Sequence, residues 1–361
     1  MLKKLPKRSR WKSSLMLAFM TTLTIVLLSI PQSVSTTATS LRTLAQQRGI
    51  LMGAAVAIEP LRKERIYREV LAREFSSVTP ENVMKFELIH PGRDRYDFTA
   101  ADDIVAFAKA NNMRVRGHVL VWHQQLPQWL TQGNFTRDEL IAILRDHIYT
   151  VVRRYRGQVF AWDVVNEAIA EDGSLRDTIW SRTIGPEYIE LAFRWANEAD
   201  PQARLFYNDY NGEGLGKKSD AIYELIQKLL QKDVPINGVG LQMHVGLKNS
   251  PPPTDVAVNI RRLAALGLDV HISEMDVKIQ DGTGTPTENL AAQAKIYQDM
   301  LDVCLSEGSC RAFVLWGFTD KHSWIPGFTG KPDAALIFDK SYRPKPAYNA
   351  LRERLMQREA R

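Results

Sequence analysis

The sequence predicts an α/β protein folded as a single (β/α)8 barrel, the TIM barrel, from three observations. Eight short runs of β-branched and apolar residues alternate with amphipathic stretches, which is the pattern of repeated βα units around a parallel sheet. Beyond about residue 41 no low-complexity linker divides the chain. The first run, MGAAVAIEP, lacks the glycine-rich turn that an open doubly wound sheet places after its first strand.

The expected strands and helices alternate along the chain. The strands are residues 50–58, 76–82, 113–122, 159–167, 203–209, 238–244, 268–276 and 311–318. Helical patterns between them include residues 63–75, 101–112, 137–155, 218–232 and 287–305, and a last helix at about 345–357 would close the ring. Although 361 residues could hold two domains, α/β barrels of about 250 residues or more routinely form one. We therefore expect a leader, residues 1–40, and one barrel domain, residues 41–361.

The formal net charge of +6 comes from the N-terminus. Six basic residues lie between Lys3 and Lys12, no acidic residue precedes Glu59, and without those six the chain has 41 basic and 41 acidic residues. A neutral domain has no electrostatic reason to bind phosphate backbones. Nucleic acid is therefore not an expected partner.

The basic segment is followed by an uncharged apolar run, Leu15 to Ile30, and by a Ser/Thr/Ala stretch that ends at Ser40. This order is typical of a secretory signal peptide, with cleavage after Ser35 or Ser40. The run is shorter than the roughly 20 residues that a membrane-spanning helix prefers. We expect a secreted or periplasmic protein without stable membrane association, and an uncleaved membrane anchor is the alternative.

Only two cysteines occur, Cys304 and Cys310. In an exported protein we expect them to form a disulfide, whereas two buried free thiols are the alternative. Their spacing brings no further ligands for a zinc site.

Polar and aromatic residues gather where the expected strands end, which is the end of a (β/α)8 barrel that carries the active site. In chain order they are Glu81, Asn82, Lys85, His118, Trp122, Asn166, Glu167, Asn208, Asp209, Gln242, His244, Glu274, Asp276 and Trp316. Any one of them could cap a helix or fill the core. Together they would surround one opening with hydrogen-bonding groups and flat apolar faces, which suit a sugar chain.

Glu167 and Glu274 would face each other across this opening. Glycoside hydrolysis uses two carboxyl groups, one that protonates the leaving oxygen and one, ionised, that attacks or stabilises the anomeric carbon. Glu167 follows the apolar segment WDVVN, which could keep it protonated. His244, at a neighbouring strand end, could hydrogen-bond the ionised form of Glu274.

The alternative function of such a cluster is to bind a divalent metal ion. Four histidines could in principle converge with acids: His118, His123, His244 and His271. The sequence contains no HxH or HExxH pair, and strand alternation puts His271 on the face opposite Ile272 and Glu274. A serine hydrolase is not indicated either, because there is no GxSxG elbow. We therefore expect neither a metal ion nor another cofactor.

At these residues the sequence resembles family 10 of the glycoside hydrolases, the endo-1,4-β-xylanases. The likeness extends from about Thr43 to Leu355. It is carried, in the family's order and spacing, by TPENVMKFE, RGHVLVWHQQLPQWL, WDVVNEA, LFYNDYN, LQMHVG, HISEMDV and VLWGFTDKHSW. Two conservative departures are Phe86, where the family often has tryptophan, and Ser273, where threonine is usual.

The resemblance implies endo-hydrolysis of β-1,4-xylosidic linkages in xylan through a covalent glycosyl-enzyme, with retention of configuration. Matching positions make Glu167 the acid/base and Glu274 the nucleophile. Asn166 would hold the 2-hydroxyl of the reacting sugar. His244 would hydrogen-bond Glu274, with Asp276 behind it to fix the tautomer. Xylan and xylo-oligosaccharides are the expected partners, and a monomer is the expected state.

The resemblance also implies substrate-binding residues. Those for sugars on the non-reducing side would be Glu81, Asn82, Lys85, His118, Trp122 and Gln125, while Gln242 and Trp316 would line the reacting subsite. Trp324 would crowd a sugar that bears a hydroxymethyl group, and so favour xylose over glucose units by about 1 to 3 kcal/mol. Cys304 and Cys310 resemble a disulfide found in part of the family.

Two other functions are alternatives. A retaining β-1,4-glucanase or mannanase would share the paired glutamates but should lack the ENVMK and DKHSW segments, which are present here. A non-catalytic carbohydrate-binding barrel would keep the tryptophans and lose a glutamate, whereas both Glu167 and Glu274 are in place.

Overall fold

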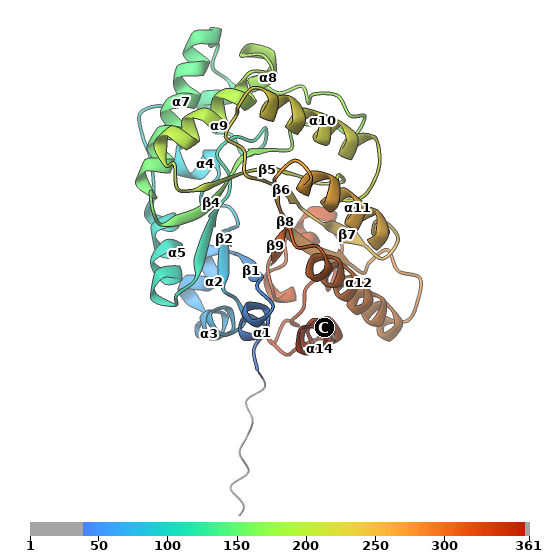
Figure 1. The fold of residues 1–361 in the computed structure, drawn as a ribbon. Coiled ribbons are helices and arrows are strands. Elements are labelled where there is room, and N and C mark those ends of the chain that lie inside the picture. The colour runs from blue at the N-terminus through green and yellow to red at the C-terminus, as the bar shows by residue number, and fades with distance from the viewer. Residues whose placement is uncertain (1–38, 358–361) are drawn as a thin grey trace, which may run out of the picture. The chain divides into compact units, whose positions relative to one another are not determined.

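The computed structural model describes residues 39–357, which belong to one compact unit (Figure 1). The leader predicted for residues 1–40 lies outside the described residues, apart from its last two positions. Its assignment as a signal peptide therefore stays a prediction. The first helix, α1 (Leu41–Gln47), begins where the barrel domain is expected to start, and the Ser40 side chain caps it by accepting from the Thr43 N–H.

Within residues 39–357, eight parallel strands close into the predicted barrel. They are β1 (Leu51–Val56), β2 (Ser77–Pro80), β3 (Arg114–Gly117), β4 (Val159–Asn166), β5 (Arg204–Asp209), β6 (Gly238–Leu241), β8 (Asp269–Lys278) and β9 (Cys310–Leu315). Pairing runs from β6 through β5, β4, β3, β2, β1 and β9 to β8, and the contact of β6 with β8 closes the ring. A short further strand, β7 (His244–Gly246), also pairs with β8. The (β/α)8 fold is confirmed and all eight predicted strands are present, although several are shorter than predicted, such as β3, for which residues 113–122 were expected.

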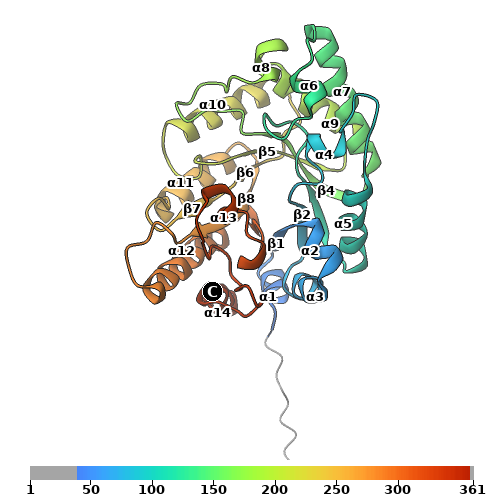
Figure 2. The same cartoon turned by 180° about the vertical axis from the view of Figure 1, so that it is seen from behind.

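Helices surround the strands in both ribbon views (Figures 1 and 2). The longer ones are α3 (Arg65–Glu74), α5 (Thr99–Ala110), α7 (Arg137–Arg154), α9 (Tyr188–Ala199), α10 (Lys217–Gln231), α11 (Pro253–Ala264), α12 (Pro286–Ser306) and α14 (Pro346–Met356). Shorter segments are α2 (Ile58–Lys63), α4 (Phe86–Ile89), α6 (Gln128–Thr131), α8 (Ile179–Thr183), η1 (Asp320–His322) and α13 (Ile325–Thr329).

The helices named from the sequence are present, and α9 and α11 complete the ring. The proline cluster at residues 251–253 leads into α11. Pro253 lies in the first turn of this helix, where the backbone N–H that proline lacks would have no partner within the helix. A capping box starts α7, in which the side chains of Thr136 and Glu139 each accept from the other's backbone N–H. Local signals of this kind fix where each helix begins relative to its strand.

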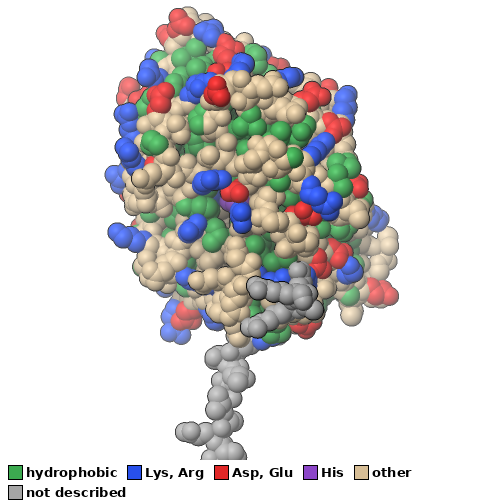
Figure 3. Space-filling view, in the orientation of Figure 1, with side chains coloured by type: hydrophobic (Ala, Val, Ile, Leu, Met, Phe, Trp, Pro, Cys, Tyr) green, Lys and Arg blue, Asp and Glu red, His purple; other side chains and the backbone are tan. Residues whose placement is uncertain are grey.

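Acidic and basic side chains are interspersed over the face drawn in Figure 3. No helix within residues 39–357 is long and apolar enough to cross a lipid bilayer.

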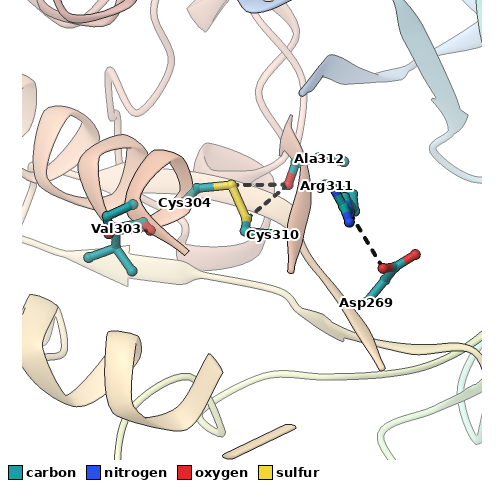
Figure 4. The surroundings of a disulfide bond; sticks show 7 residues. Asp269, Val303, Cys304, Cys310, Arg311 and Ala312 are labelled. Atoms are coloured by element: carbon teal, nitrogen blue, oxygen red, sulfur yellow. Dashed lines mark hydrogen bonds and ion pairs between the residues drawn. A yellow bond between two sulfur atoms is a disulfide. The ribbon is translucent and has the colours of Figure 1, made fainter. Parts of the chain in front are cut away.

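Cys304 and Cys310 form a disulfide, which joins the end of α12 to the start of β9 (Figure 4). The predicted bridge is confirmed, and the alternative of two free thiols is excluded.

Candidate active site

Glu167 and Glu274 lie at the carboxyl-terminal end of the barrel. Glu167 directly follows β4, Glu274 lies in the second half of β8, and both side chains are buried. Asn166 donates from Nδ2 to Glu167 Oε1 at 3.1 Å. Asn208, a strand-end residue for which the sequence suggested no role, donates from Nδ2 to Asn166 Oδ1 at 2.8 Å and to Glu274 Oε1 at 2.6 Å. A chain of two amides therefore links the two carboxylates.

Neutral donors hold the Glu167 carboxylate. Trp122 donates from Nε1 to Oε2 at 2.8 Å, and Gln242 donates from Nε2 to Oε1 at 3.0 Å. Together with the Asn166 amide, these groups fix the carboxylate without placing a charged donor on it. They are three of the residues that the sequence assigned to substrate binding.

The backbone of Glu167 is in a left-handed conformation, with φ at +57°, which a non-glycine residue keeps only where its surroundings enforce it. Its N–H donates to the Asn208 carbonyl at 2.9 Å, and its carbonyl accepts from Arg176 Nε at 2.8 Å. The next N–H, that of Ala168, donates to the Tyr207 hydroxyl at 3.1 Å. Contacts with β5 therefore hold the turn that aims Glu167.

Two histidines face Glu274. His244 Nε2 donates to Oε2 at 3.1 Å, and His118 Nδ1 lies 3.9 Å from Oε1. Burial alone would raise the Glu274 pKa, but the charge of His118 and the hydrogen bond and charge of His244 outweigh burial and lower this pKa. Glu274 is therefore held in its ionised form, which a carboxylate nucleophile requires.

His244 lies between two carboxylates. Its Nδ1 donates to Asp276 Oδ2 at 2.9 Å, while its Nε2 donates to Glu274. Burial would lower the pKa of His244, but the charges and hydrogen bonds of Asp276 and Glu274 raise this pKa to about 10. Both ring nitrogens therefore carry protons at neutral pH. The predicted contact of Asp276 with His244 is present, and with the ring doubly protonated this carboxylate stabilises the imidazolium.

Two tryptophans lie on the Glu274 side of the site. Trp324 donates from Nε1 to Asp276 Oδ2 at 2.8 Å. The Trp324 ring lies edge-on to His244, with 5.2 Å between centroids. Trp316 meets the rings of His118 and His244 edge-on, at centroid distances of 5.1 and 6.0 Å. Both tryptophans therefore lie beside His244, the histidine that contacts Glu274.

Lys85 lies at the centre of the residues expected to bind sugars on the non-reducing side. Its Nζ donates to Asn82 Oδ1 at 3.0 Å and to Gln125 Oε1 at 2.7 Å. The same atom lies 4.9 Å from the centroid of the Trp122 ring. Glu81 accepts from Asn82 Nδ2 at 3.4 Å. Burial lowers the pKa of Lys85 and raises the pKa of Glu81, which is the effect of enclosing both groups in the protein.

The sequence interpretation missed a charged layer beneath Glu274. Asp163 and Arg116 are buried inside the barrel. Arg116 donates from Nε to Asp163 Oδ2 at 3.0 Å, and His118 Nδ1 lies 3.0 Å from the same oxygen. The available signal was Asp163, the one charged residue of the largely apolar strand β4, since Asp is almost never fully buried unless paired.

The predicted orientation of His271 is wrong with respect to Glu274, because both side chains point into the barrel. His271 contacts Arg116 of β3 through Nδ1 at 2.7 Å, and its ring lies 4.3 Å from that of Phe206 on β5. The pairing of β8 with β9 shifts after Ile272, so strict alternation fails along this strand. Within residues 39–357, no group of three or more His, Cys, Asp or Glu side chains is arranged to hold a metal ion.

A pair of buried carboxylates at the carboxyl ends of the strands of a (β/α)8 barrel is the arrangement of a glycoside hydrolase. The chain belongs to glycosyl hydrolase family 10, whose sequence model matches residues 40–354. The resemblance inferred from the motifs is confirmed.

Relatives and solved structures place the chain close to named xylanases. It is 48% identical over 315 residues to endo-1,4-beta-xylanase B of Thermotoga neapolitana, covering 87% of this chain and 90% of the relative. It is 42% identical over 294 residues to a beta-1,4-xylanase of Dictyoglomus thermophilum, covering 78% and 82% of the two chains. The crystal structure of xylanase 10B from Thermotoga petrophila RKU-1 in complex with xylobiose matches with a TM-score of 0.85 and 48% identity, covering 88% of this chain and 97% of that one.

Proposed function

We propose that this chain is an endo-1,4-β-xylanase that hydrolyses xylan with retention of configuration. The observation that carries the proposal is the pair of buried glutamates, Glu167 and Glu274, with unlike hydrogen-bond partners at one end of the barrel. Membership of family 10 and the xylanases among the relatives support it. The similar structure with bound xylobiose supports xylo-oligosaccharides as ligands.

In the first step, ionised Glu274 attacks the anomeric carbon. The bond from that carbon to the glycosidic oxygen breaks, and Glu167 gives its proton to the departing oxygen. His244 keeps the nucleophile ionised before attack, because it is itself protonated and donates to Glu274. The product of this step is a covalent glycosyl-enzyme and a shortened chain.

In the second step, a water molecule occupies the space left by the departing chain. Glu167, now ionised, takes a proton from the water while the water oxygen attacks the anomeric carbon and the bond to Glu274 breaks. Trp122, Asn166 and Gln242 hold the Glu167 carboxylate in both steps. Two displacements at one carbon restore the original configuration.

The surrounding residues bind and select the sugar. Asn166 lies between the two carboxylates, where we place the 2-hydroxyl of the reacting xylose. The Lys85 group offers donors and acceptors for hydroxyls on the non-reducing side, and Trp122 offers a ring face. Trp324 is fixed against Asp276, which leaves it little freedom to move aside for a hydroxymethyl group. This favours xylan over the β-1,4-glucan and mannan of the alternative readings.

The test measures new reducing ends released from xylan and from carboxymethylcellulose by residues 41–361. We expect strong release from xylan, little from carboxymethylcellulose, and loss of both in Glu274→Ala. Glu224→Ala is the matched control, because Glu224 is an exposed glutamate of α10 that pairs only at long distance with Lys228. An inactive wild type, or an active Glu274→Ala protein, would contradict the proposal.

We also propose that the protein is exported, as the order of residues at its N-terminus suggests. The disulfide between Cys304 and Cys310 supports this, because disulfides form and persist in oxidising compartments. Intact mass of the protein recovered from periplasm or medium should correspond to a chain that begins after Ser35 or Ser40. A full-length mass in the membrane fraction would instead favour the uncleaved anchor.

A further inference from the structure

A second cavity lies at the amino-terminal end of the barrel, opposite the two glutamates. Its volume is about 720 Å³, within the range of about 300 to 1,000 Å³ typical of small-molecule sites. The residues that begin strands form much of its wall. They are Leu51 of β1, Arg114 of β3, Arg204 of β5 and Asp269 of β8, and Arg311 is the second residue of β9. The first turns of α1 contribute Arg42.

The lining is strongly basic, since four arginines face a single aspartate. Arg204 and Arg311 share Asp269, at 2.6 and 3.6 Å, and Figure 4 shows Arg311 directed toward that carboxylate. His271 adds no charge, because burial and the neighbouring Arg116 hold its pKa well below the usual value. Asp269 therefore offsets only one of the four positive charges.

The two remaining arginines have no carboxylate partner within residues 39–357. Arg42 donates to the backbone carbonyls of Ala72, Asn111 and Asn112, which are neutral. Arg114 lies over the Phe160 ring, 5.4 Å from its centroid. Phe160 is only partly buried and also lines the cavity, so an apolar ring face lies beside the uncompensated charge.

The barrel fixes the backbone positions of several of these groups, which favours a preformed site. Arg114, Arg204 and Arg311 project from barrel strands, and Arg311 directly follows Cys310, which the disulfide ties to α12. Guanidinium groups bind carboxylates and phosphates through paired hydrogen bonds. We propose that this cavity binds a small polyanion that carries two or more carboxylate or phosphate groups. The proposal is independent of the activity at the other end of the barrel.

The test is isothermal titration of residues 41–361 with citrate and, separately, with inorganic pyrophosphate, at an ionic strength fixed with sodium chloride. We expect saturable binding of at least one probe at one site per chain, and the tighter probe identifies the anionic group preferred. The double variant Arg114→Gln, Arg311→Gln should weaken binding at least about tenfold, because it removes two charged donors. Release of reducing ends from xylan should be unchanged, which also shows that the variant is folded.

The matched control is Arg65→Gln, since Arg65 is exposed on α3, pairs with Glu69 and does not line the cavity. It should bind each probe as the wild type does. If the double variant does not fold, Arg114→Gln alone carries the test, because Arg114 makes no ion pair within the described residues. Absence of saturable binding of both probes, or equal affinity in the wild type and the variant, would overturn the proposal.

Discussion

Glu167 and Glu274 are the same residue type at the same end of one barrel, yet their surroundings differ. Glu167 accepts hydrogen bonds from an indole and two amides, none of which carries a charge. Glu274 faces the imidazoles of His244 and His118. The difference shows how one side chain serves two roles: charged neighbours keep one carboxylate ionised, while neutral donors only hold the other in place.

The backbone differs as well. Glu274 lies within strand β8, whereas Glu167 lies just beyond β4 in a left-handed conformation. The position of Glu274 is therefore fixed by the barrel itself. The position of Glu167 depends on individual contacts with Asn208, Arg176 and Tyr207, so it should be the easier of the two to disturb.

The largest expected effect distinguishes the two glutamates by how the activity of each variant depends on the leaving group of the substrate. Glu274→Ala should reduce kcat by about ten-thousandfold or more on every substrate, because no nucleophile remains. Glu167→Ala should lose about a hundredfold to ten-thousandfold on xylan. With a dinitrophenyl xylobioside as substrate, Glu167→Ala should form the glycosyl-enzyme nearly as fast as the wild type, because that leaving group needs no proton. Burst kinetics on the aryl glycoside measures this step, and a burst in Glu274→Ala but not in Glu167→Ala would reverse the assignment.

A smaller effect is expected when His244, the charged side chain that donates to Glu274, is replaced. In His244→Gln the Glu274 pKa should rise, because the positive charge that lowers it is lost, while the glutamine amide can still donate a hydrogen bond. Activity requires ionised Glu274 and is lost as the pH falls through its pKa, so the acidic limb of the kcat/KM profile should move to higher pH. The fall in kcat/KM relative to the wild type should therefore be largest at the pH of the old acidic limb and should disappear above it.

A matched control for this measurement is His322→Gln. His322 also pairs with a glutamate, since its Nε2 lies 3.0 Å from Glu64 Oε1. Within residues 39–357 it makes no hydrogen bond or ion pair with Glu274. The acidic limb of the kcat/KM profile of His322→Gln should lie at the same pH as in the wild type. If both variants shift the limb equally, or if neither does, the charge of His244 is not what keeps Glu274 ionised.

Much of this comparison could be predicted from the sequence. The two glutamates are each embedded in a dense motif, WDVVNEA and HISEMDV, and alternating apolar runs and helical patterns located the eight strands that bring them together. His244 was also found, because it falls at the end of a strand that neighbours β8. The order and the ends of the strands can be read from local sequence patterns. The regular (β/α)8 fold then brings the residues at the strand ends together.

What the sequence could not provide depends on contacts across the barrel. Asp163 and Arg116 lie on two neighbouring strands, β4 and β3, and the sequence does not reveal the register that pairs them beside His118. The inward direction of His271 follows from a register shift in β8, which alternation cannot reveal. The protonation of His244 likewise requires knowing that two carboxylates reach the same ring.

The smallest expected effect tests whether Glu167 depends on its backbone contacts. The buried Tyr207 hydroxyl accepts from the Ala168 N–H at 3.1 Å and donates to Asp209 Oδ2 at 2.5 Å. Tyr207→Phe leaves that N–H without its partner and loosens the turn that holds Glu167. We expect kcat on xylan to fall about tenfold with little change in KM, because a small misplacement of a catalytic group costs rate rather than binding. On the dinitrophenyl glycoside, the first step should be nearly unaffected.

Tyr155→Phe separates this local effect from a general loss of stability. Tyr155 is also fully buried and donates to an aspartate, Asp102 at 3.0 Å, but it lies at the end of α7 away from both glutamates. Each variant loses one buried hydroxyl, so both thermal midpoints should fall, and further in Tyr207→Phe because both partners of that hydroxyl are buried. Only Tyr207→Phe should lower kcat. Equal kcat values for the two variants would mean that the barrel fixes Glu167 as firmly as it fixes Glu274, and the contrast between their backbones would have no catalytic consequence.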